Sequence, residues 1–352
     1  MSSKKRFSAV LLTGQPFESV PAGVERYSQL LSNALDGLQT IYFTPFSDSI
    51  SWPFLSEPYK AKIVANQLNE RLAELDPEVV FYNGLYGWAL PKKTPFLKIG
   101  LVHGTWKSLA KNAMPWGFNR LRCEYAYAWF EKKSFSNADL LVSNSNFCRE
   151  LLKTDYRLDS QVIHPPADSN FFHPRDKRKA RKKIGVKEDE RIVLFVGRPE
   201  YYKGFDRVEA LAKETDWHFI SITFPKATSK WIDAREPVSP AVLGEYYAAA
   251  DVVLFPSRFE SFGFVTIESL ATHTPVVTTP FGIAKEISHP YCKVVTNPQL
   301  SNFKKAVTDA LTPPQASFLE IEKIFSFTPF QEKLQTLLET HLSQNGFSKK
   351  VF

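Results

Sequence analysis

A loop in the second half of the chain carries two cations at a spacing that suits a diphosphate. Arg198 and Lys203 lie five residues apart, between Gly197 and Gly204, directly after the apolar run 192–196. A guanidinium forks onto two phosphate oxygens and a lysine ammonium supplies a compact charge, so this pair could stabilise a diphosphate leaving group. An ordinary solvated loop would carry the same residues, and both interpretations stay open at this point.

A second segment places two carboxylates around a glycine turn. Glu260 precedes Phe262-Gly263, and Glu268 follows more than one helical turn later. Gly263 would let a ligand approach the backbone, and the free N–H groups at the start of a helix over 263–272 can hold an anion. The two acids need not face the same atom, so one can reach a sugar and the other a pair of hydroxyls such as those of a ribose. The alternatives are that Glu260 caps the helix and that Glu268 faces water.

The elements that must position these residues alternate between strand and helix. In the first half, the pattern predicts strands at 8–12, 40–44, 79–82, 97–102 and 140–143, and helices at 25–38, 63–75 and 116–135. In the second half, it predicts strands at 191–196, 218–222, 252–255 and 275–278, and helices at 206–213, 240–250 and 263–272. This alternation predicts an α/β fold with doubly wound, Rossmann-like parallel sheets, whose ligands bind at the carboxyl ends of the strands.

The length of the chain, 352 residues, favours two domains over a single core. Pro165-Pro166 end the first strand–helix series and mark a hinge, which places one domain at 1–165 and a second at 166–325. A basic run over 175–183 either forms a nucleic-acid or lipid patch or is the solvated first helix of the second domain. The Ile184-Gly185-Val186 that follows favours the helix, because it is typical of a helix C-terminus.

Composition excludes several classes of protein. The chain has 43% hydrophobic and 23% charged residues, as in an ordinary folded protein, and no run of ~18 apolar residues that could cross a membrane. Its first apolar run ends too early for a signal peptide. The three cysteines have no metal-ligand spacing and indicate reduced, buried thiols of a cytoplasmic protein. The net charge of +7 favours anionic partners, but no recognisable nucleic-acid module is present, and we expect no bound nucleic acid and no metal.

Together the two motifs resemble those of the retaining GT-B glycosyltransferases (glycosyltransferase family 4, glycosyl transferases group 1). That family has two glutamates separated by seven residues, with Phe-Gly after the first and Pro-Ser upstream, a pattern met from Pro256-Ser257 to Glu268. Its upstream Gly-Arg and Lys-Gly pairs are met at 197–198 and 203–204, and Asp251 matches the aspartate that opens the strand before the acids. The resemblance implies two Rossmann-like domains facing a central cleft. It also implies that the first domain binds the acceptor, that the second binds the nucleotide sugar, and that a last helix within 326–352 crosses back to the first.

The resemblance assigns roles to residues of the second domain. Arg198 and Lys203 would neutralise the donor diphosphate. Glu260 would contact the transferring sugar, and Glu268 would bond the ribose of the nucleotide. Further donor contacts are assigned to Phe262, Gly263 and Phe264.

Two residues of the first domain receive roles in the same way. The segment 21–26 resembles the glycine loop of the family, so Gly23 is assigned to donor binding, although Ala22 replaces the first of the two usual glycines. His103 ends the strand 97–102 and is assigned a place beside the donor sugar. A lone histidine is more often structural, but one at the end of a buried strand is a better candidate. The stretch 205–238 lacks the Gly-x-Gly turn that the family usually has near the base.

The implied reaction is the retaining transfer of a hexose from a UDP- or GDP-sugar to a hydroxyl of a glycan or a lipid-linked acceptor. The leaving phosphate takes the acceptor proton, and cations stabilise the charge on the diphosphate, so no cofactor and no metal are expected. A GT-B sugar-nucleotide epimerase and a non-catalytic nucleotide-sugar-binding protein are the alternatives.

The acceptor side of the sequence is rich in aromatic and basic residues. Between 106 and 133, the chain combines such aromatic residues as Trp116, Phe118, Tyr125 and Trp129 with six lysines and arginines. This composition would suit peripheral contact with an anionic membrane, at its inner, cytoplasmic face, and a lipid-linked acceptor. However, four of the apolar residues are spaced as one helix stripe, and such a stripe would equally suit the core.

Overall fold

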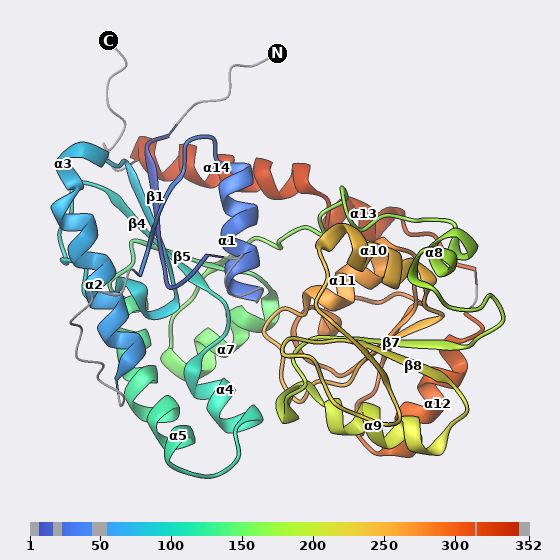
Figure 1. Cartoon of the computed structure of the whole chain (residues 1–352). Coiled ribbons are helices and arrows are strands. Elements are labelled where there is room, and N and C mark those ends of the chain that lie inside the picture. Colours follow the sequence, from blue (N-terminus) through green and yellow to red (C-terminus); the bar gives the residue numbers. More distant parts are fainter. Residues whose placement is uncertain (1–6, 17–22, 44–54, 314, 345–352) are drawn as a thin grey trace, which may run out of the picture. The chain divides into compact units, whose positions relative to one another are not determined.

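The structure is a computed structural model that describes residues 7–16, 23–43, 55–313 and 315–344 (Figure 1). The chain divides into two compact units. Unit 1 contains residues 1–165 and 328–352, and unit 2 contains residues 166–327. Each unit has its own six-stranded sheet, which confirms the predicted pair of parallel α/β sheets.

The sheet of unit 1 has the strand order β2-β1-β3-β4-β5-β6, and every neighbouring pair is parallel. The strands are β1 (Ala9–Thr13), β2 (Gln39–Tyr42), β3 (Val79–Asn83), β4 (Leu97–Val102), β5 (Leu140–Ser143) and β6 (Gln161–Val162). Strands β1, β3 and β4 are buried at every position, as expected for the centre of a doubly wound sheet. Their sequences are therefore nearly continuous apolar runs, and this is why they could be predicted.

The helices of unit 1 connect these strands, except for the last helix, which follows unit 2. They are α1 (Gly23–Ala34), α2 (Ser56–Glu70), α3 (Leu72–Leu75), α4 (Trp106–Ala113), α5 (Phe118–Leu121), α6 (Ala128–Ser136), α7 (Asn146–Tyr156) and α14 (Phe327–Gln344). Helix α14 returns from the end of unit 2 and packs on α1 in unit 1 (Figure 1). The ring of Phe330 meets the edge of Tyr27 at 5.9 Å, and the Gln331 side chain donates to the Ala34 carbonyl at 2.9 Å.

The sheet of unit 2 has the order β12-β11-β10-β7-β8-β9, and its neighbouring strands are also parallel. The strands are β7 (Ile192–Val196), β8 (His218–Ile222), β9 (Asp233–Arg235), β10 (Val252–Phe255), β11 (Val276–Thr278) and β12 (Cys292–Val294). The helices are α8 (Lys177–Ile184), α9 (Phe205–Glu214), α10 (Pro240–Ala249), α11 (Phe264–Ala271), α12 (Leu300–Ala310) and α13 (Leu319–Ile324). Because β7 and β10 are neighbours, the loops that follow them lie at the same edge of the sheet.

The basic run of the second domain is the predicted first helix, α8. Gly185 ends the helix in the left-handed conformation, with φ of 74°. Arg181 is buried and its guanidinium lies 2.8 Å from Asp251, while Lys183 pairs with Glu245 at 2.7 Å. These ion pairs attach α8 to the rest of unit 2, so the basic run 175–183 forms a structural helix of that unit.

Several predicted helix boundaries were wrong. The helix predicted at 25–38 ends at Ala34, and the one predicted at 63–75 begins at Ser56 and is interrupted at Arg71. The helical segment predicted at 116–135 begins at Phe118 and contains a π-helical section from Arg122 to Tyr127. The π-helical section adds one residue to a turn, so it rotates the side chains that follow it around the helix axis. A prediction that assumes α-helical spacing throughout misses this rotation.

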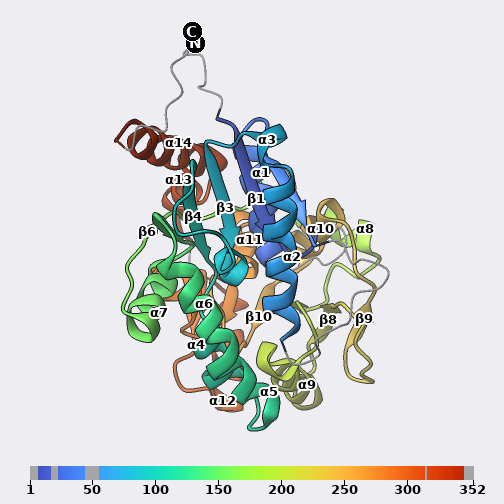
Figure 2. The same ribbon diagram turned by 90° about the vertical axis from the view of Figure 1, so that its left-hand side faces the viewer.

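The apolar stripe of that segment faces solvent. Its members Phe118, Leu121, Tyr125 and Trp129 are all exposed, as is the neighbouring Trp116. The interpretation of the stripe as core is therefore wrong. Figure 2 shows α4, α5 and α6 lying together, in green, at the end of unit 1 that carries these residues.

Two expectations from composition can be compared with the described residues. All three cysteines are buried and free of disulfide bonds, as predicted. Within the described part of the chain, no helix combines the length and the apolar character that crossing a membrane requires.

Candidate active site

The cationic loop of unit 2 follows β7 and is shaped by two glycines. Gly197 has φ of 147° and its N–H donates to the Ile222 carbonyl on β8 at 3.1 Å. Gly204 has φ of 75° and leads into α9. A Cβ at Gly204 would lie only 2.2 Å from the carbonyl oxygen of Pro256, so the loop after β7 touches the loop after β10. Only glycine permits this approach.

The two loops bring Lys203 and Glu260 together. The Lys203 ammonium lies 2.5 Å from Glu260 Oε1, and both side chains are largely buried. The ammonium also lies over the rings of Tyr202 and Phe255, at 5.2 and 5.7 Å from their centres. The cation predicted to hold phosphate and the carboxylate predicted to contact the sugar thus neutralise each other in this structure.

Arg198 lies on the same loop and is about half exposed, with 48% of its side-chain surface accessible. Its guanidinium contacts the Tyr202 hydroxyl and lies 3.5 Å from Glu200 Oε1. Burial raises the pKa of Tyr202, which keeps that hydroxyl protonated. Arg198 therefore presents its charge to solvent beside the partly exposed Glu200, whereas the ammonium of Lys203 is held against the largely buried Glu260.

Glu268 lies inside unit 2 rather than on its surface. It is buried on α11, and Tyr247 of α10 donates to its Oε2 at 2.7 Å. The alternative that Glu268 faces water is therefore wrong. The alternative that Glu260 caps α11 finds no support either, because that helix has no side-chain cap.

The start of α11 presents main-chain groups, rather than polar side chains, to a ligand. Gly263 is its N-cap residue and has φ of 87°, in the left-handed region that favours glycine. The side chain of Phe262 is buried and its ring meets that of Phe264 at 5.0 Å. The Phe262 carbonyl accepts from the Ile283 N–H at 2.8 Å. A ligand at this turn would therefore meet the main chain of Gly263 and Phe264.

Arg258 ties the two loops of unit 2 together, and sequence reasoning missed it. Its N–H donates to the Tyr202 carbonyl at 2.7 Å, and its guanidinium binds both carboxylate oxygens of Asp206 at 2.7 and 2.8 Å. The same guanidinium lies 3.5 Å from the centre of the Tyr201 ring. These contacts hold the segment that carries Lys203 in place.

The predicted residues of unit 1 lie at the carboxyl ends of its strands and at the start of α1. Gly23 is the exposed first residue of α1, whereas Pro21 and Ala22 of the predicted glycine loop lie outside the described residues. His103 directly follows β4, and its Nε2 lies 2.8 Å from Asn83 Oδ1. Burial lowers the pKa of His103 to about 4, so its imidazole is neutral at physiological pH.

Asn83 was also missed, although the sequence contains a signal for it. It is a polar residue at the end of the apolar run 79–82, and the carboxyl ends of parallel strands are where such folds place functional groups. Asn83 is buried and its amide joins His103 to β1 and α1.

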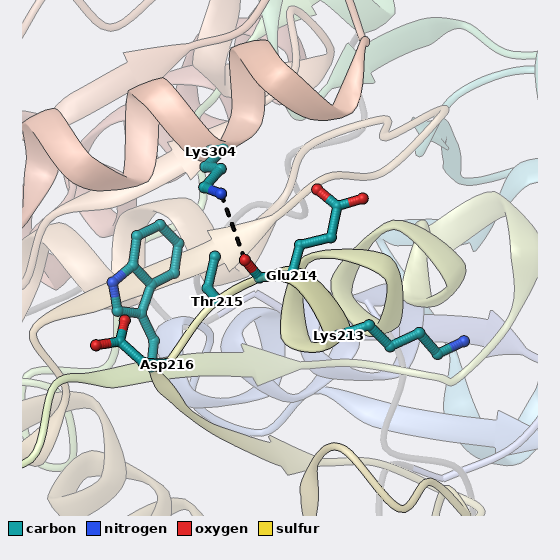
Figure 3. A pocket seen from close by; sticks show the side chains of 6 residues that line it. Lys213, Glu214, Thr215, Asp216 and Lys304 are labelled. Atoms are coloured by element: carbon teal, nitrogen blue, oxygen red, sulfur yellow. Dashed lines mark hydrogen bonds between the residues drawn. The ribbon is translucent and has the colours of Figure 1, made fainter.

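A surface depression of about 420 Å³ lies elsewhere on unit 2 (Figure 3). It lies where α9 ends and β8 begins, and the Lys304 ammonium reaches the Glu214 carbonyl there at 3.3 Å. The depression is thus at the amino end of β8, whereas the loop of Lys203 follows the carboxyl end of β7. No described group of three or more histidine, cysteine or acidic residues is arranged to hold a metal ion.

Both halves of the chain match known protein families. Residues 21–171 match the family described as Glycosyltransferase Family 4, and residues 190–312 match the family described as Glycosyl transferases group 1. A D-inositol 3-phosphate glycosyltransferase of Segniliparus rotundus is 32% identical in an alignment 187 residues long, which covers 45% of this chain and 42% of that protein. The aligned region thus spans less than half the length of this curated relative.

Solved structures match over nearly the whole chain. Sucrose-phosphate synthase from Thermosynechococcus elongatus aligns with a TM-score of 0.75 and 16% identity, over 96% of this chain and 99% of that one. Anabaena Alr3699/HepE in complex with UDP and glucose aligns with a TM-score of 0.66 and 15% identity, over 95% and 100%. These likenesses establish the GT-B fold. Together with the family matches, they show that the chain belongs to glycosyltransferase family 4, the glycosyl transferases group 1.

Proposed function

We propose that this protein is a retaining glycosyltransferase that moves a hexose from a UDP- or GDP-sugar to a hydroxyl of a glycan or a lipid-linked acceptor. The observation that carries the proposal is the pairing of Lys203 with Glu260 on the loops after β7 and β10, next to α11 with its buried Glu268. The likeness to a structure that holds UDP and glucose supports a uridine nucleotide as the first donor to test.

The Lys203–Glu260 pair explains how a donor would be received. A diphosphate oxygen can replace Glu260 as the partner of the ammonium, and a sugar hydroxyl can then donate to the freed carboxylate. Both charges keep a partner throughout, so donor binding avoids the large cost of an unpaired buried charge. Arg198 is exposed and can fork onto the same diphosphate.

The proposed chemistry is electrostatic. As the bond between sugar and phosphate breaks, negative charge grows on the diphosphate, where Lys203 and Arg198 stabilise it. The leaving phosphate oxygen takes the proton of the acceptor hydroxyl as the new glycosidic bond forms on the same face of the sugar. Neither a carboxylate nucleophile nor a metal ion takes part in this scheme.

Nucleotide release tests the function. With UDP-hexoses and GDP-hexoses, we expect one donor to release its nucleoside diphosphate at a rate that rises with an added acceptor. NMR of the product should show the anomeric configuration of the donor. Conversion of the donor into an isomeric sugar without transfer would favour the epimerase. Donor binding without turnover, across a panel of glycan and lipid-linked acceptors, would favour the binding protein.

The exposed aromatic residues of unit 1 support a lipid-linked acceptor and a place at the inner face of an anionic membrane. We call Trp116, Phe118, Leu121, Tyr125 and Trp129 the aromatic patch; Trp116 is 75% exposed and Tyr125 66%. Tryptophan and tyrosine favour the level of the lipid headgroups because their rings are apolar with one polar edge. Single apolar side chains scattered over a surface would need no explanation, but these five exposed side chains lie within one short segment, 116–129.

The charged residues around the aromatic patch indicate which kind of membrane surface the patch would contact. Residues 107–133 contain six lysines and arginines and two glutamates. One of the glutamates, Glu131, is buried, and this burial raises its pKa to about 8, so it is uncharged at neutral pH. The Lys133 ammonium lies 5.5 Å from the ring of Trp129, and Arg120 lies 5.2 Å from Trp116. Each cation near an anionic bilayer adds about 1 kcal/mol of attraction.

Sedimentation with vesicles tests the patch. We expect the protein to sediment with vesicles of phosphatidylglycerol and phosphatidylcholine, and far less with phosphatidylcholine alone. Replacing Trp116, Phe118 and Trp129 with serine should reduce binding at least tenfold without lowering the melting temperature, because these side chains are already exposed. The matched control replaces Trp231 and Leu319, which are exposed on unit 2, with serine and should bind normally. Equal binding by both variants would rule out this surface.

A further inference from the structure

Three successive carbonyl oxygens in the turn that carries Lys203 accept from the loop after β10. The Arg258 guanidinium donates to the Tyr201 carbonyl, and the Arg258 N–H donates to the Tyr202 carbonyl at 2.7 Å. The Ser257 hydroxyl lies 3.5 Å from the Lys203 carbonyl oxygen. The turn is therefore anchored through its main chain, at the lysine itself and at the two residues before it.

The guanidinium of Arg258 is itself held in place. Only 16% of its side-chain surface is accessible, and Asp206 in the first turn of α9 accepts from two of its nitrogens, at 2.7 and 2.8 Å. A planar guanidinium can bind the carboxylate and the Tyr201 carbonyl together, whereas a lysine ammonium is a point charge on a flexible stem. Because Asp206 matches its charge, Arg258 is suited to fixing the loop rather than to binding a phosphate.

The same loop carries Arg258 and Glu260, and this matters when a donor binds. In the proposed function, a diphosphate oxygen replaces Glu260 as the partner of the Lys203 ammonium. The contacts of Arg258 with the turn persist after that ion pair opens, because they involve neither the ammonium nor the Glu260 carboxylate. They hold the lysine while negative charge grows on the diphosphate, when a displacement of about 1 Å can cost about 10²-fold in rate.

We propose that Arg258 is a positioning residue, which fixes the main chain of Lys203 so that its ammonium stays in place for the diphosphate after Glu260 has released it. This inference rests on the proposed function for the identity of the ligand, but not for the anchoring of the turn, which lies within unit 2. Loss of Arg258 should therefore lower kcat. A direct contact between Arg258 and the donor would instead contribute to donor binding, so its loss would raise KM.

The kinetics of Arg258→Lys test this distinction. The lysine keeps the positive charge but cannot make the contacts with Tyr201 and Asp206 together. We expect kcat to fall at least about tenfold and the KM for the donor to change by less than about twofold. A rise in KM with kcat unchanged would show direct donor binding and overturn the proposal.

A second arginine–aspartate pair supplies the matched control. In unit 1, the Arg149 guanidinium binds both carboxylate oxygens of Asp159, at 2.6 and 3.0 Å. Arg149→Lys should keep both kcat and KM. If Arg258→Lys does not fold, as judged by its melting temperature, Asp206→Asn takes its place. That variant loosens the guanidinium but leaves its contact with the Tyr201 carbonyl, so kcat should fall less steeply, again with KM unchanged.

A double-mutant cycle shows whether Arg258 acts through Lys203. When Lys203→Ala is already present, adding Arg258→Lys should lower kcat by less than about twofold more, because the group that Arg258 positions is gone. Losses that multiply would mean that Arg258 acts independently of the ammonium, and they would contradict the proposal. Asp206→Asn should show the same lack of additivity.

Hydrogen exchange tests the anchoring without any substrate. The N–H groups of Lys203 and Gly204 are hydrogen-bonded inside the turn, to the carbonyls of Glu200 and Tyr201 at 3.0 and 3.1 Å. Their exchange requires the turn to open, so the exchange rate reports how firmly the loop after β10 holds it.

The comparison is made in Glu260→Gln, which removes the negative charge of the ion pair as donor binding would. Adding Arg258→Lys should speed exchange of the two N–H groups at least about tenfold, whereas adding Arg149→Lys should leave it unchanged. Equal exchange in these two double variants would overturn the proposal, whether or not the protein is a transferase. Faster exchange with Arg258→Lys, together with no turnover of any donor by the wild type, would instead count against the proposed function.

Discussion

Replacing Lys203 with alanine is expected to lower kcat at saturating donor by about 10²–10³-fold, the effect of removing one preorganised group that stabilises transition-state charge. The structure adds a reason for a large effect. Glu260 would lose the ammonium 2.5 Å from its carboxylate and would present an unpaired negative charge close to the incoming diphosphate. The measurement is nucleotide release under donor saturation, with melting temperature as a check on folding.

Two further variants separate these contributions. Lys213→Ala removes a half-exposed lysine of the same unit and should leave kcat unchanged. The double variant Lys203→Ala, Glu260→Gln removes the unpaired charge as well as the cation. Partial recovery relative to Lys203→Ala alone would show the repulsion, and the remaining loss would measure the stabilisation by the ammonium together with the contact of the Glu260 carboxylate to the sugar. Near-normal turnover of Lys203→Ala would rule out its role at the diphosphate.

The fold was predictable because its determinants are local. The central strands are buried on both faces, so residues 79–82, 97–102 and 252–255 read as apolar runs whatever their partners are. The glycines of the two loops could also be identified from the sequence, because a left-handed backbone conformation favours glycine at that position. Helix ends were less predictable, because the π-helical section at Arg122–Tyr127 leaves no local mark.

The contacts within the candidate site depend on the tertiary structure. Lys203 and Glu260 are 57 residues apart in sequence, and Asn83 and His103 are 20 residues apart, at the ends of two neighbouring strands. Glu260 and Glu268 could both be identified from their spacing in the motif. The spacing does not reveal that Glu260 pairs with Lys203, or that Glu268 is buried and accepts a hydrogen bond from Tyr247. The exposure of the apolar stripe was also unpredictable. A helical pattern shows that apolar side chains share one face of a helix, but it does not show whether other elements cover that face.

Gly204→Ala should be strongly damaging, and Gly185 supplies its control. The two glycines share nearly the same φ, 75° and 74°. An alanine at either position meets the same conformational strain, about 1–2 kcal/mol. At Gly185 nothing lies within 4 Å of the added Cβ. At Gly204 the Cβ would lie 2.2 Å from the Pro256 carbonyl oxygen and 2.8 Å from its carbon, so backbone must move.

The difference between the two variants isolates the clash between the loops. By urea denaturation, we expect Gly204→Ala to lose about 1–3 kcal/mol more than Gly185→Ala, as for an overpacked interior. Its kcat should also fall steeply, since moving Pro256 separates the loop of Lys203 from the loop of Glu260, whereas Gly185→Ala should keep full activity. Equal losses of stability would mean that the loops yield without cost. In that case the Lys203–Glu260 pair would depend on its own attraction, and the contact at Gly204 would not be what brings the donor-binding residues together.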